Sequence, residues 1–211
     1  VWRCQHCRSI HCEKIADLAD YYEDYALRQQ TRGYFMDAGL AIILRRLRAL
    51  GLKKSHRILD YGCGHGVLLS YLRDQGYKLA FGYDPYTSGY SDPKILNGRF
   101  DFVLCLDVIE HDPNFRSLIK TLSSILNPAG TLIFTSPNAD FINLQDPEKT
   151  IHFLHMPCHV QIFSPNTLKM VIETETNLRQ LALYNNWFMN AVWPGTSTKF
   201  FMYHMSLNGN D

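Results

Sequence analysis

The hydrophobic positions of this chain follow a helical period first and a mixture of strand and helix periods afterwards. Between Ile15 and Leu50, apolar residues recur at spacings of three and four, which predicts helices that end before Gly51. Beyond Gly51, short runs rich in β-branched and aromatic residues alternate with helical stretches. The predicted strands are Arg57–Tyr61, Leu79–Tyr83, Phe102–Leu106, Thr131–Thr135, Arg179–Tyr184 and Lys199–Met205. The predicted helices are Gly66–Gln75, Phe115–Leu126 and Pro165–Glu173, the last with Ser164 as its N-cap.

This alternation predicts an α/β fold, in which a mostly parallel sheet carries helices on both faces. One long stretch, Ser136–Ser164, contains prolines and histidines but no periodicity. A long irregular segment in a compact domain is usually functional, and this one leaves the carboxyl end of a predicted strand, where open α/β sheets bind ligands. We therefore expect residues 136–164 to form a lid over a ligand site.

Composition narrows the class of protein. The chain has 211 residues, of which 46% are hydrophobic, with 21 basic against 20 acidic side chains. This size and apolar fraction predict one medium domain with a real core, and the balanced charge argues against nucleic acid as a partner. No apolar run approaches the roughly 20 residues of a membrane span, and no signal peptide is recognisable. We expect a soluble, cytoplasmic protein with no membrane partner.

The six cysteines are too few for a disulfide scaffold, so we expect reduced thiols. Cys4 and Cys7 form one C-x-x-C knuckle, with His11 and Cys12 close behind. A structural zinc site usually joins two such knuckles, and only one is present in this sequence. The favoured interpretation is a half-site that binds nothing by itself, and zinc shared with a second knuckle from an upstream segment is the alternative.

The sharpest motif is a glycine-rich loop between a predicted strand and a predicted helix. Gly62, Gly64 and Gly66 allow a tight turn and let a ligand approach bare backbone. Asp84 ends the next strand, about 20 residues later, where a carboxylate accepts hydrogen bonds from ribose hydroxyls. The third glycine comes one residue earlier than in the dinucleotide pattern G-x-G-x-x-G, and Val67 stands in its place. The loop therefore favours an adenosine-type cofactor without a pyrophosphate.

With these residues in view, the chain resembles the class I S-adenosylmethionine-dependent methyltransferases. Four blocks carry the resemblance in the family's order: Ile58–Gly66 (ILDYGCGHG), Gly82–Asp84 (GYD), Phe100–His111 (FDFVLCLDVIEH) and Leu126–Leu132 (LNPAGTL). Asp112-Pro113 and the later His159–Pro165 (HVQIFSP) are most similar to the subgroup of ubiquinone-biosynthesis O-methyltransferases and bacterial small-molecule enzymes, some of which carry cysteine knuckles ahead of the domain. The resemblance implies a Rossmann-like sheet whose last strand is antiparallel, and S-adenosylmethionine as cofactor.

The resemblance also assigns the cofactor site by position. Gly62, Cys63 and Gly64 would line the methionine and adenosine parts, and Asp84 would hold the ribose. The full set of implied cofactor residues is Asp60, Tyr61, Gly62, Cys63, Gly64, Asp84, Pro85, Leu106 and Asp107. One departure is visible, because the short stretch between Asp84 and Asp101 is rich in Ser, Gly, Pro and Asn, and the family's usual third strand and adenine-contacting acid are hard to find there.

The catalytic assignment rests on the chemistry of methyl transfer. The protein must align the acceptor and exclude water, and a hydroxyl acceptor benefits from a general base near neutral pH. The candidate bases are His111 and His159. Two metal alternatives stay open, and neither enters the assigned site. Asp107, Glu110 and His111 would share one face of a helical turn and could hold a divalent cation, whereas His152, His155, Cys158 and His159 have a spacing compatible with zinc.

The sequence thus predicts an S-adenosylmethionine-dependent methyltransferase for a small-molecule, sugar-type or carrier-linked acceptor, with oxygen preferred. The expected organisation is a partial cysteine knuckle over residues 1–14, a helical cap over 15–50 and the methyltransferase domain over 51–211. Aromatic residues of the cap, Tyr21, Tyr22, Tyr25, Tyr34 and Phe35, are expected to line the substrate or to pack the helices. A non-catalytic methyltransferase-like binding module and a nicotinamide-dependent oxidoreductase are the alternatives.

Overall fold

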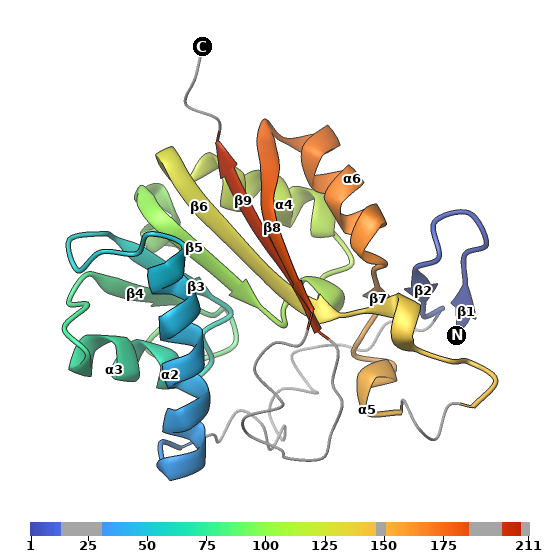
Figure 1. The fold of residues 1–211 in the computed structure, drawn as a ribbon, viewed down its shortest axis with the longest axis horizontal. Coiled ribbons are helices and arrows are strands. Elements are labelled where there is room, and N and C mark those ends of the chain that lie inside the picture. Colours follow the sequence, from blue (N-terminus) through green and yellow to red (C-terminus); the bar gives the residue numbers. More distant parts are fainter. Residues whose placement is uncertain (14–30, 147–150, 186–199, 208–211) are drawn as a thin grey trace.

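A six-stranded sheet forms the centre of the molecule, with the strand order β4-β3-β5-β6-β9-β8 (Figure 1). The structure is a computed structural model that describes residues 1–13, 31–146, 151–185 and 200–207. The strands of this sheet are β3 (Ile58–Tyr61), β4 (Ala80–Tyr83), β5 (Phe100–Leu106), β6 (Leu126–Pro137), β8 (Leu178–Asn185) and β9 (Phe200–Leu207). Strands β3 to β6 pair in parallel, and β9 runs antiparallel to both β6 and β8. The prediction of a mostly parallel sheet with an antiparallel last strand is confirmed.

Helices cover both faces of the sheet, as the alternating pattern predicted. The helices are α2 (Tyr34–Ala49), α3 (Val67–Asp74), α4 (Phe115–Ser124) and α6 (Pro165–Glu175). Neighbouring residues of β5 point to opposite faces: Phe102 packs with α2 and α3, and Val103 packs with α4 and α6. Of the helical pattern predicted from Ile15, the structure describes α2, whereas Tyr21, Tyr22 and Tyr25 lie outside the described residues.

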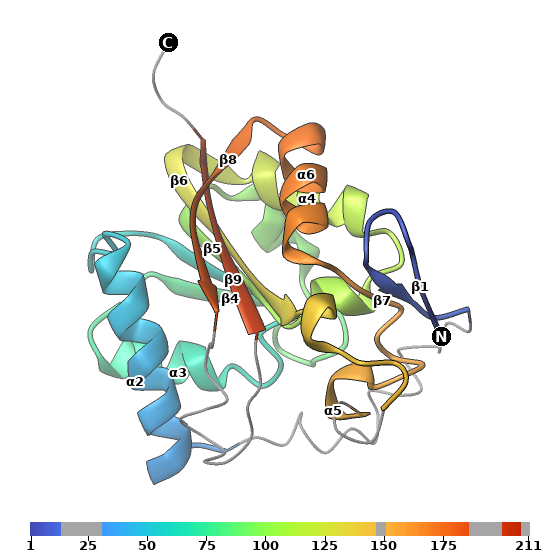
Figure 2. The same ribbon diagram turned by 45° about the vertical axis from the view of Figure 1, so that its right-hand side comes forward.

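A second, smaller sheet joins the N-terminus to the segment before α6. It consists of β1 (Trp2–Arg3), β2 (Ile10–His11) and β7 (Gln161–Ile162), in that order. Figure 2 shows the β1–β2 hairpin beside β7, next to the chain that leads into α6. Two-residue strands are too short to produce a hydrophobic period, so the sequence predicted none of them.

The stretch predicted to be irregular contains several short elements. After β6 come η4 (Ala139–Phe141), α5 (Ile151–Leu154) and then β7. Their apolar side chains form a separate small core with the hairpin, made of Ile10, Ala139, Ile142, Leu154 and Ile162. Because Ile10 is completely buried there, the hairpin is part of the folded core of this region.

Strand β4 is the edge of the large sheet. The chain between β4 and β5 makes a turn and a short 3-10 helix, η2 (Pro93–Asn97), and no strand. Ile95 and Leu96 of η2 pack against the core on the α4 and α6 side. The predicted absence of the usual third strand is therefore confirmed.

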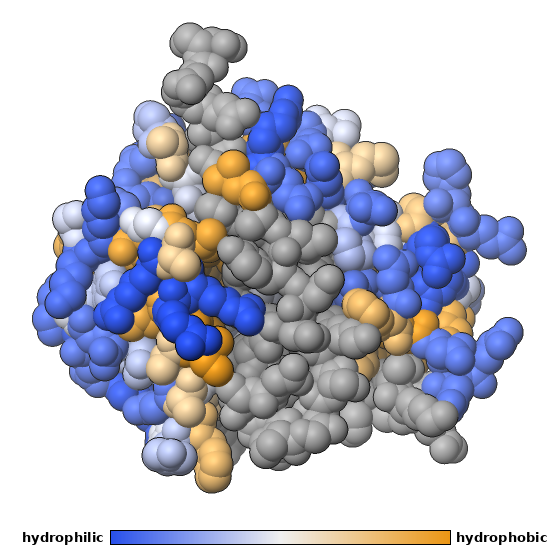
Figure 3. All heavy atoms as spheres, in the orientation of Figure 1, coloured by the Kyte–Doolittle hydropathy of each residue, from blue (hydrophilic) through white to orange (hydrophobic). Residues whose placement is uncertain are grey.

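The described surface mixes hydrophilic and hydrophobic residues. On the face in Figure 3, hydrophobic residues lie along α2, whose Phe35 is 67% exposed. Within the described ranges, no helix combines the length and the apolarity that a membrane crossing requires.

Candidate active site

The carboxyl ends of three neighbouring parallel strands meet at one edge of the large sheet. Tyr61 at the end of β3 lies opposite Tyr83 of β4 on one side and Cys105 of β5 on the other. The residues predicted to bind the cofactor all lie at these strand ends or directly after them: Asp60, Tyr61, Gly62, Cys63 and Gly64 at β3, Asp84 and Pro85 at β4, and Leu106 and Asp107 at β5. The structure thus brings the predicted set together at the position where open α/β sheets bind ligands.

The glycines of the loop after β3 serve two different purposes. Gly62 and Gly64 both adopt left-handed backbone angles, with φ of +79° and +50°. A Cβ atom on Gly62 would lie 2.3 Å from Cγ2 of Val108, whereas a Cβ atom on Gly64 would meet nothing within 4 Å. Gly62 is therefore required for packing against the chain after β5. Gly64 presents its backbone to open space, where a ligand has room.

Asp84 connects the glycine loop to the turn after β4. Its Oδ2 accepts a hydrogen bond from the Gly64 N–H at 2.9 Å, and its Oδ1 accepts one from the Tyr86 N–H at 2.9 Å. Each carboxylate oxygen has a second lone pair, so Asp84 can still accept hydrogen bonds from two ribose hydroxyls. Pro85, the next residue, is exposed to solvent.

Asp60 lies beneath the loop and is only 4% exposed. Burial and, secondarily, the negative charge of Asp84 raise the pKa of its carboxyl group to about 7. Both protonation states are therefore populated near neutral pH, and a bound cation would favour the ionised form. Burial likewise raises the pKa of the neighbouring Cys63 thiol, which stays protonated and is not a candidate nucleophile.

Asp107 occupies the end of β5 in a left-handed conformation, with φ of +54°. Its Oδ1 accepts a hydrogen bond from the Thr135 hydroxyl at 2.6 Å, and its N–H donates to the carbonyl of Thr135 at 3.1 Å. The carboxylate is thus engaged with β6, and Asp107 does not join Glu110 and His111 on one helical face. That prediction was wrong because the chain after β5 turns into a short 3-10 helix, η3 (Ile109–His111), in place of an α-helical turn.

His159 takes the place predicted for Asp107 beside Glu110 and His111. One potential ligand atom from each of these three residues lies within 4.8 Å of the others. Nδ1 of His111 lies 3.0 Å from the carbonyl oxygen of Cys158, and Nδ1 of His159 lies 2.8 Å from that of Phe153. A carbonyl oxygen only accepts, so each Nδ1 carries the proton and each Nε2 is the basic nitrogen of its ring.

This cluster is buried and electrostatically unusual. Neither oxygen of the Glu110 carboxylate has a hydrogen-bond partner among the described residues, and burial raises the pKa of this group well above its usual range. Burial also lowers the pKa of His111 to about 4 and that of His159 to about 3, so both imidazoles are neutral at pH 7. Such a cluster can accept a proton at Nε2 or hold a divalent cation.

The alternative zinc grouping around the same histidines is arranged differently. Cys158 offers its carbonyl oxygen to His111, and the ring of His155 lies 5.3 Å from that of His159. The side chain of His152 is outside the described residues. Among the residues that are described, the one close group of three or more metal-ligating side chains is Glu110, His111 and His159.

Sequence reasoning named His111 and His159 separately but did not place Glu110 between them. The segments that contain Glu110 and His159 are far apart in the chain and are joined by hydrogen bonds, among them one from the Val160 N–H to the carbonyl of Glu110 at 2.9 Å. No spacing rule for a single helix or strand reports such a contact.

The family described as "Methyltransferase domain" matches residues 28–181. Among curated proteins, a ubiquinone biosynthesis O-methyltransferase of Bradyrhizobium diazoefficiens is 27% identical over 129 residues, which cover 52% of this chain and 51% of the relative. The corresponding protein of Coxiella burnetii is 28% identical over 109 residues, covering 42% and 46%. The chain spans about half the length of the curated relatives it matches.

Solved structures with the same fold include two with bound S-adenosylhomocysteine. Magnesium protoporphyrin IX methyltransferase of Synechocystis superposes with a TM-score of 0.61 at 17% identity, covering 90% of this chain and 97% of the other. A 1,6-didemethyltoxoflavin-N1-methyltransferase of Burkholderia thailandensis superposes with a TM-score of 0.56 at 15% identity, covering 90% and 82%.

Proposed function

Because this chain belongs to the family described as Methyltransferase domain, we propose that it transfers a methyl group from S-adenosylmethionine to an oxygen atom of a small-molecule acceptor. Its fold is the Rossmann-like α/β fold of the S-adenosylmethionine-dependent methyltransferases. The observation that carries the proposal is the pairing of Gly64, whose backbone faces open space, with the Asp84 carboxylate bonded to its N–H.

The residues at this edge fit the proposed cofactor. Asp84 retains lone pairs for the ribose hydroxyls, and the open backbone of Gly64 leaves room for the chain that carries the methionine. Asp60, with a pKa of about 7, becomes a favourable neighbour for a cationic ligand when it ionises. Because the usual third strand is missing, the turn after Asp84 is the part of the chain that would border the adenine.

Small hydroxylated molecules are the favoured acceptors. The curated relatives are named O-methyltransferases of ubiquinone biosynthesis, and the solved methyltransferases of similar fold are named for a porphyrin and a toxoflavin precursor. These names support a small molecule as acceptor and oxygen as the methylated atom. A non-catalytic binding module is the competing hypothesis. The chain has both the predicted cofactor residues at the strand ends and the buried cluster of Glu110, His111 and His159, which argues against that hypothesis.

In the proposed mechanism, the protein positions the acceptor and takes up its proton. S-adenosylmethionine supplies a methyl group whose carbon–sulfur bond breaks as the new bond to oxygen forms. His111 or His159 accepts the hydroxyl proton at Nε2, since its Nδ1 is held by a backbone carbonyl. Burial of both rings keeps them neutral, which is the state that can accept a proton, and at the same time makes them weaker bases.

A divalent cation is a second way for the same cluster to activate a hydroxyl. Neither carboxylate oxygen of Glu110 has a hydrogen-bond partner among the described residues. Each histidine has its Nδ1 bonded to a backbone carbonyl, as is usual for metal ligands, so Nε2 is the ligand atom. Two imidazoles and one carboxylate suit zinc, manganese or iron better than magnesium. Bound there, a cation would lower the pKa of a coordinated hydroxyl.

Calorimetric titration with S-adenosylhomocysteine tests the cofactor site. We expect the wild type to bind S-adenosylhomocysteine and not NADH, and Asp84→Ala and Asp84→Asn to weaken binding by about tenfold or more, the loss of a hydrogen bond to a charged group. Asp92→Ala is the matched control, because Asp92 is exposed and caps η2. No binding by the wild type refutes the proposed function, and equal binding by the Asp84 variants refutes the role of Asp84.

Acceptor screening then tests the histidines. With a panel of hydroxylated small molecules and detection of released S-adenosylhomocysteine, an active acceptor identifies an enzyme, and its absence favours the binding module. We expect His111→Gln or His159→Gln to lower kcat by about 100-fold or more, and His155→Gln to change it little. If Glu110→Gln and EDTA leave the rate intact, the histidines act as bases. Loss of activity with EDTA that zinc or manganese restores indicates the cation instead.

A further inference from the structure

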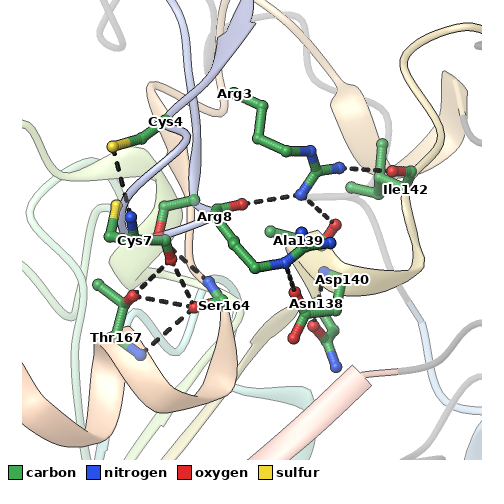
Figure 4. Close-up of polar contacts among 11 residues, drawn as sticks. Arg3, Cys4, Cys7, Arg8, Asn138, Ala139, Asp140, Ile142, Ser164 and Thr167 are labelled. Carbon is green, nitrogen blue, oxygen red and sulfur yellow. Dashed lines mark hydrogen bonds and ion pairs between the residues drawn. The ribbon is translucent and has the colours of Figure 1, made fainter.

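The N-terminal hairpin, residues 2–11, is held to the start of α6 and to the chain around η4 by several polar contacts (Figure 4). The carbonyl oxygen of Cys7 accepts hydrogen bonds from the hydroxyls of Ser164 at 2.9 Å and Thr167 at 2.7 Å. The N–H of Ser164 donates to the hydroxyl of Ser9 at 3.2 Å. The hairpin is therefore hydrogen-bonded to the start of α6, which follows His159 closely in the chain.

Arg3 makes the most extensive of these contacts. Its guanidinium donates to the carbonyl oxygens of Ala139 at 2.9 Å, Ile142 at 2.5 Å and Arg8 at 2.8 Å. In Figure 4 it lies between the turn of the hairpin and the chain after β6. One side chain thus ties the hairpin to η4, and hydrogen bonds from a charged donor are stronger than neutral ones.

The second strand of the hairpin continues this connection to the cluster. Ile10 and His11 of β2 pair with Ile162 and Gln161 of β7. One residue further along, the N–H of Cys12 donates to the carbonyl of Val160 at 3.0 Å, while the N–H of Val160 donates to the carbonyl of Glu110 at 2.9 Å. The backbone of Val160, next to His159, is therefore hydrogen-bonded to the chain after β2 on one side and to η3 on the other.

We propose that Arg3 is a positioning residue of the active site, which holds the hairpin in place and through it keeps His159 against Glu110 and His111. The proposal deepens the proposed function and rests on it for the catalytic meaning of His159. Arg3 acts through backbone carbonyls. Its hydrogen bonds to described residues go to Arg8, Ala139 and Ile142.

Two measurements without cofactor or acceptor test this inference. Hydrogen–deuterium exchange of the peptide covering residues 158–164 should become at least about tenfold faster in Arg3→Ala, because loss of even one charged hydrogen bond corresponds to that factor. In nitrogen-15 spectra of labelled histidines, the His159 ring, assigned with His159→Gln, should lose its single Nδ1–H tautomer. A general loss of stability would not select this ring.

Arg8→Ala is the matched control in the same hairpin. Its side chain forms an ion pair with Asp140 at 3.2 Å, with side chains that are 63% and 38% exposed, and such pairs contribute little. We expect wild-type exchange and an unchanged His159 signal. Should Arg3→Ala fail to fold by circular dichroism, Arg3→Lys decides, because it keeps the charge but not the fork, and should give an intermediate increase.

The outcomes separate this inference from the proposed function. Unchanged exchange and an unchanged His159 tautomer in the Arg3 variants, or an equal effect of Arg8→Ala, would overturn the positioning role, whatever ligand the protein binds. Failure of S-adenosylhomocysteine binding by the wild type would overturn the proposed function and leave the measured positioning of His159 intact.

Discussion

At the scale of single residues, Asp60 gives a pH dependence with a definite sign. The folded protein raises its pKa to about 7, above the value of an unfolded chain, so the folded state binds the proton more tightly. The associated stability is fully present below about pH 4 and is lost as the pH rises through 7. Relative to Asp60→Asn, the wild type should lose free energy of unfolding over this range, on the order of a few kcal/mol.

Urea unfolding of the two proteins at a series of pH values measures this difference. Other titrating groups largely cancel in the comparison, because they are present in both proteins. A difference that stays level between pH 4 and 7 would show that water or a neighbouring group solvates the Asp60 carboxylate in the folded state.

The residues predicted to bind the cofactor could be located from the sequence because they lie at strand ends or directly after them. Gly62, Gly64 and Asp84 stand at positions that the parallel sheet brings together whatever the remaining chain does. The second purpose of Gly62, packing against Val108, was not predictable, since it depends on how the chain after β5 turns. The meeting of Glu110 with His159 depends in the same way on long-range backbone hydrogen bonds.

At the scale of elements, the start of α6 offers a direct test of the hairpin contact. The Ser164 hydroxyl accepts a hydrogen bond from the Thr167 N–H, as an N-cap does, and donates to the carbonyl of Cys7. Ser164→Ala should lower the free energy of unfolding by about 1–2 kcal/mol, because both bonds are lost. Asn114→Ala is the control, since the Asn114 side chain makes no capping bond to α4, and we expect a change within about 0.5 kcal/mol.

Chemical unfolding of both variants gives the comparison. An equal loss in Ser164→Ala and Asn114→Ala would mean that the Ser164 hydroxyl is replaced by water without loss, and that the hairpin is held by its strand pairing and by Arg3.

Most long elements were predictable and the short ones were not. Strand β6 is the exception, because only Thr131–Thr135 was predicted as a strand and its first residue, Leu126, was assigned to the preceding helix. Helix α4 was expected to begin at Phe115 and does so, and β8 and β9 differ from their predicted bounds by one or two residues. These elements carry a full period of apolar residues. Strands β1, β2 and β7 have two residues each and are formed by their partners, so no local pattern in the sequence reports them.

At the scale of the whole molecule, the fold class followed from the alternation of strand and helix patterns, including the missing third strand. What the pattern left out is the second sheet, which links the first residues of the chain to the segment before α6. The knuckle at Cys4 and Cys7 was interpreted as a half-site that binds nothing by itself, which stays a prediction. The hairpin that carries it is hydrogen-bonded to α6 and η4, which the sequence did not predict. The sequence contained the chemistry of both regions but not their proximity.

The position of β9 governs when the sheet can close during synthesis. The four parallel strands β3 to β6 are all contained in the first 137 residues, but β9, at 200–207, lies between β6 and β8. Until β9 has been synthesised, β6 has one unpaired edge and β8 has no neighbour in the sheet. Unpaired edges attract other strands, so a chain that has not yet formed β9 is exposed to pairing with other chains.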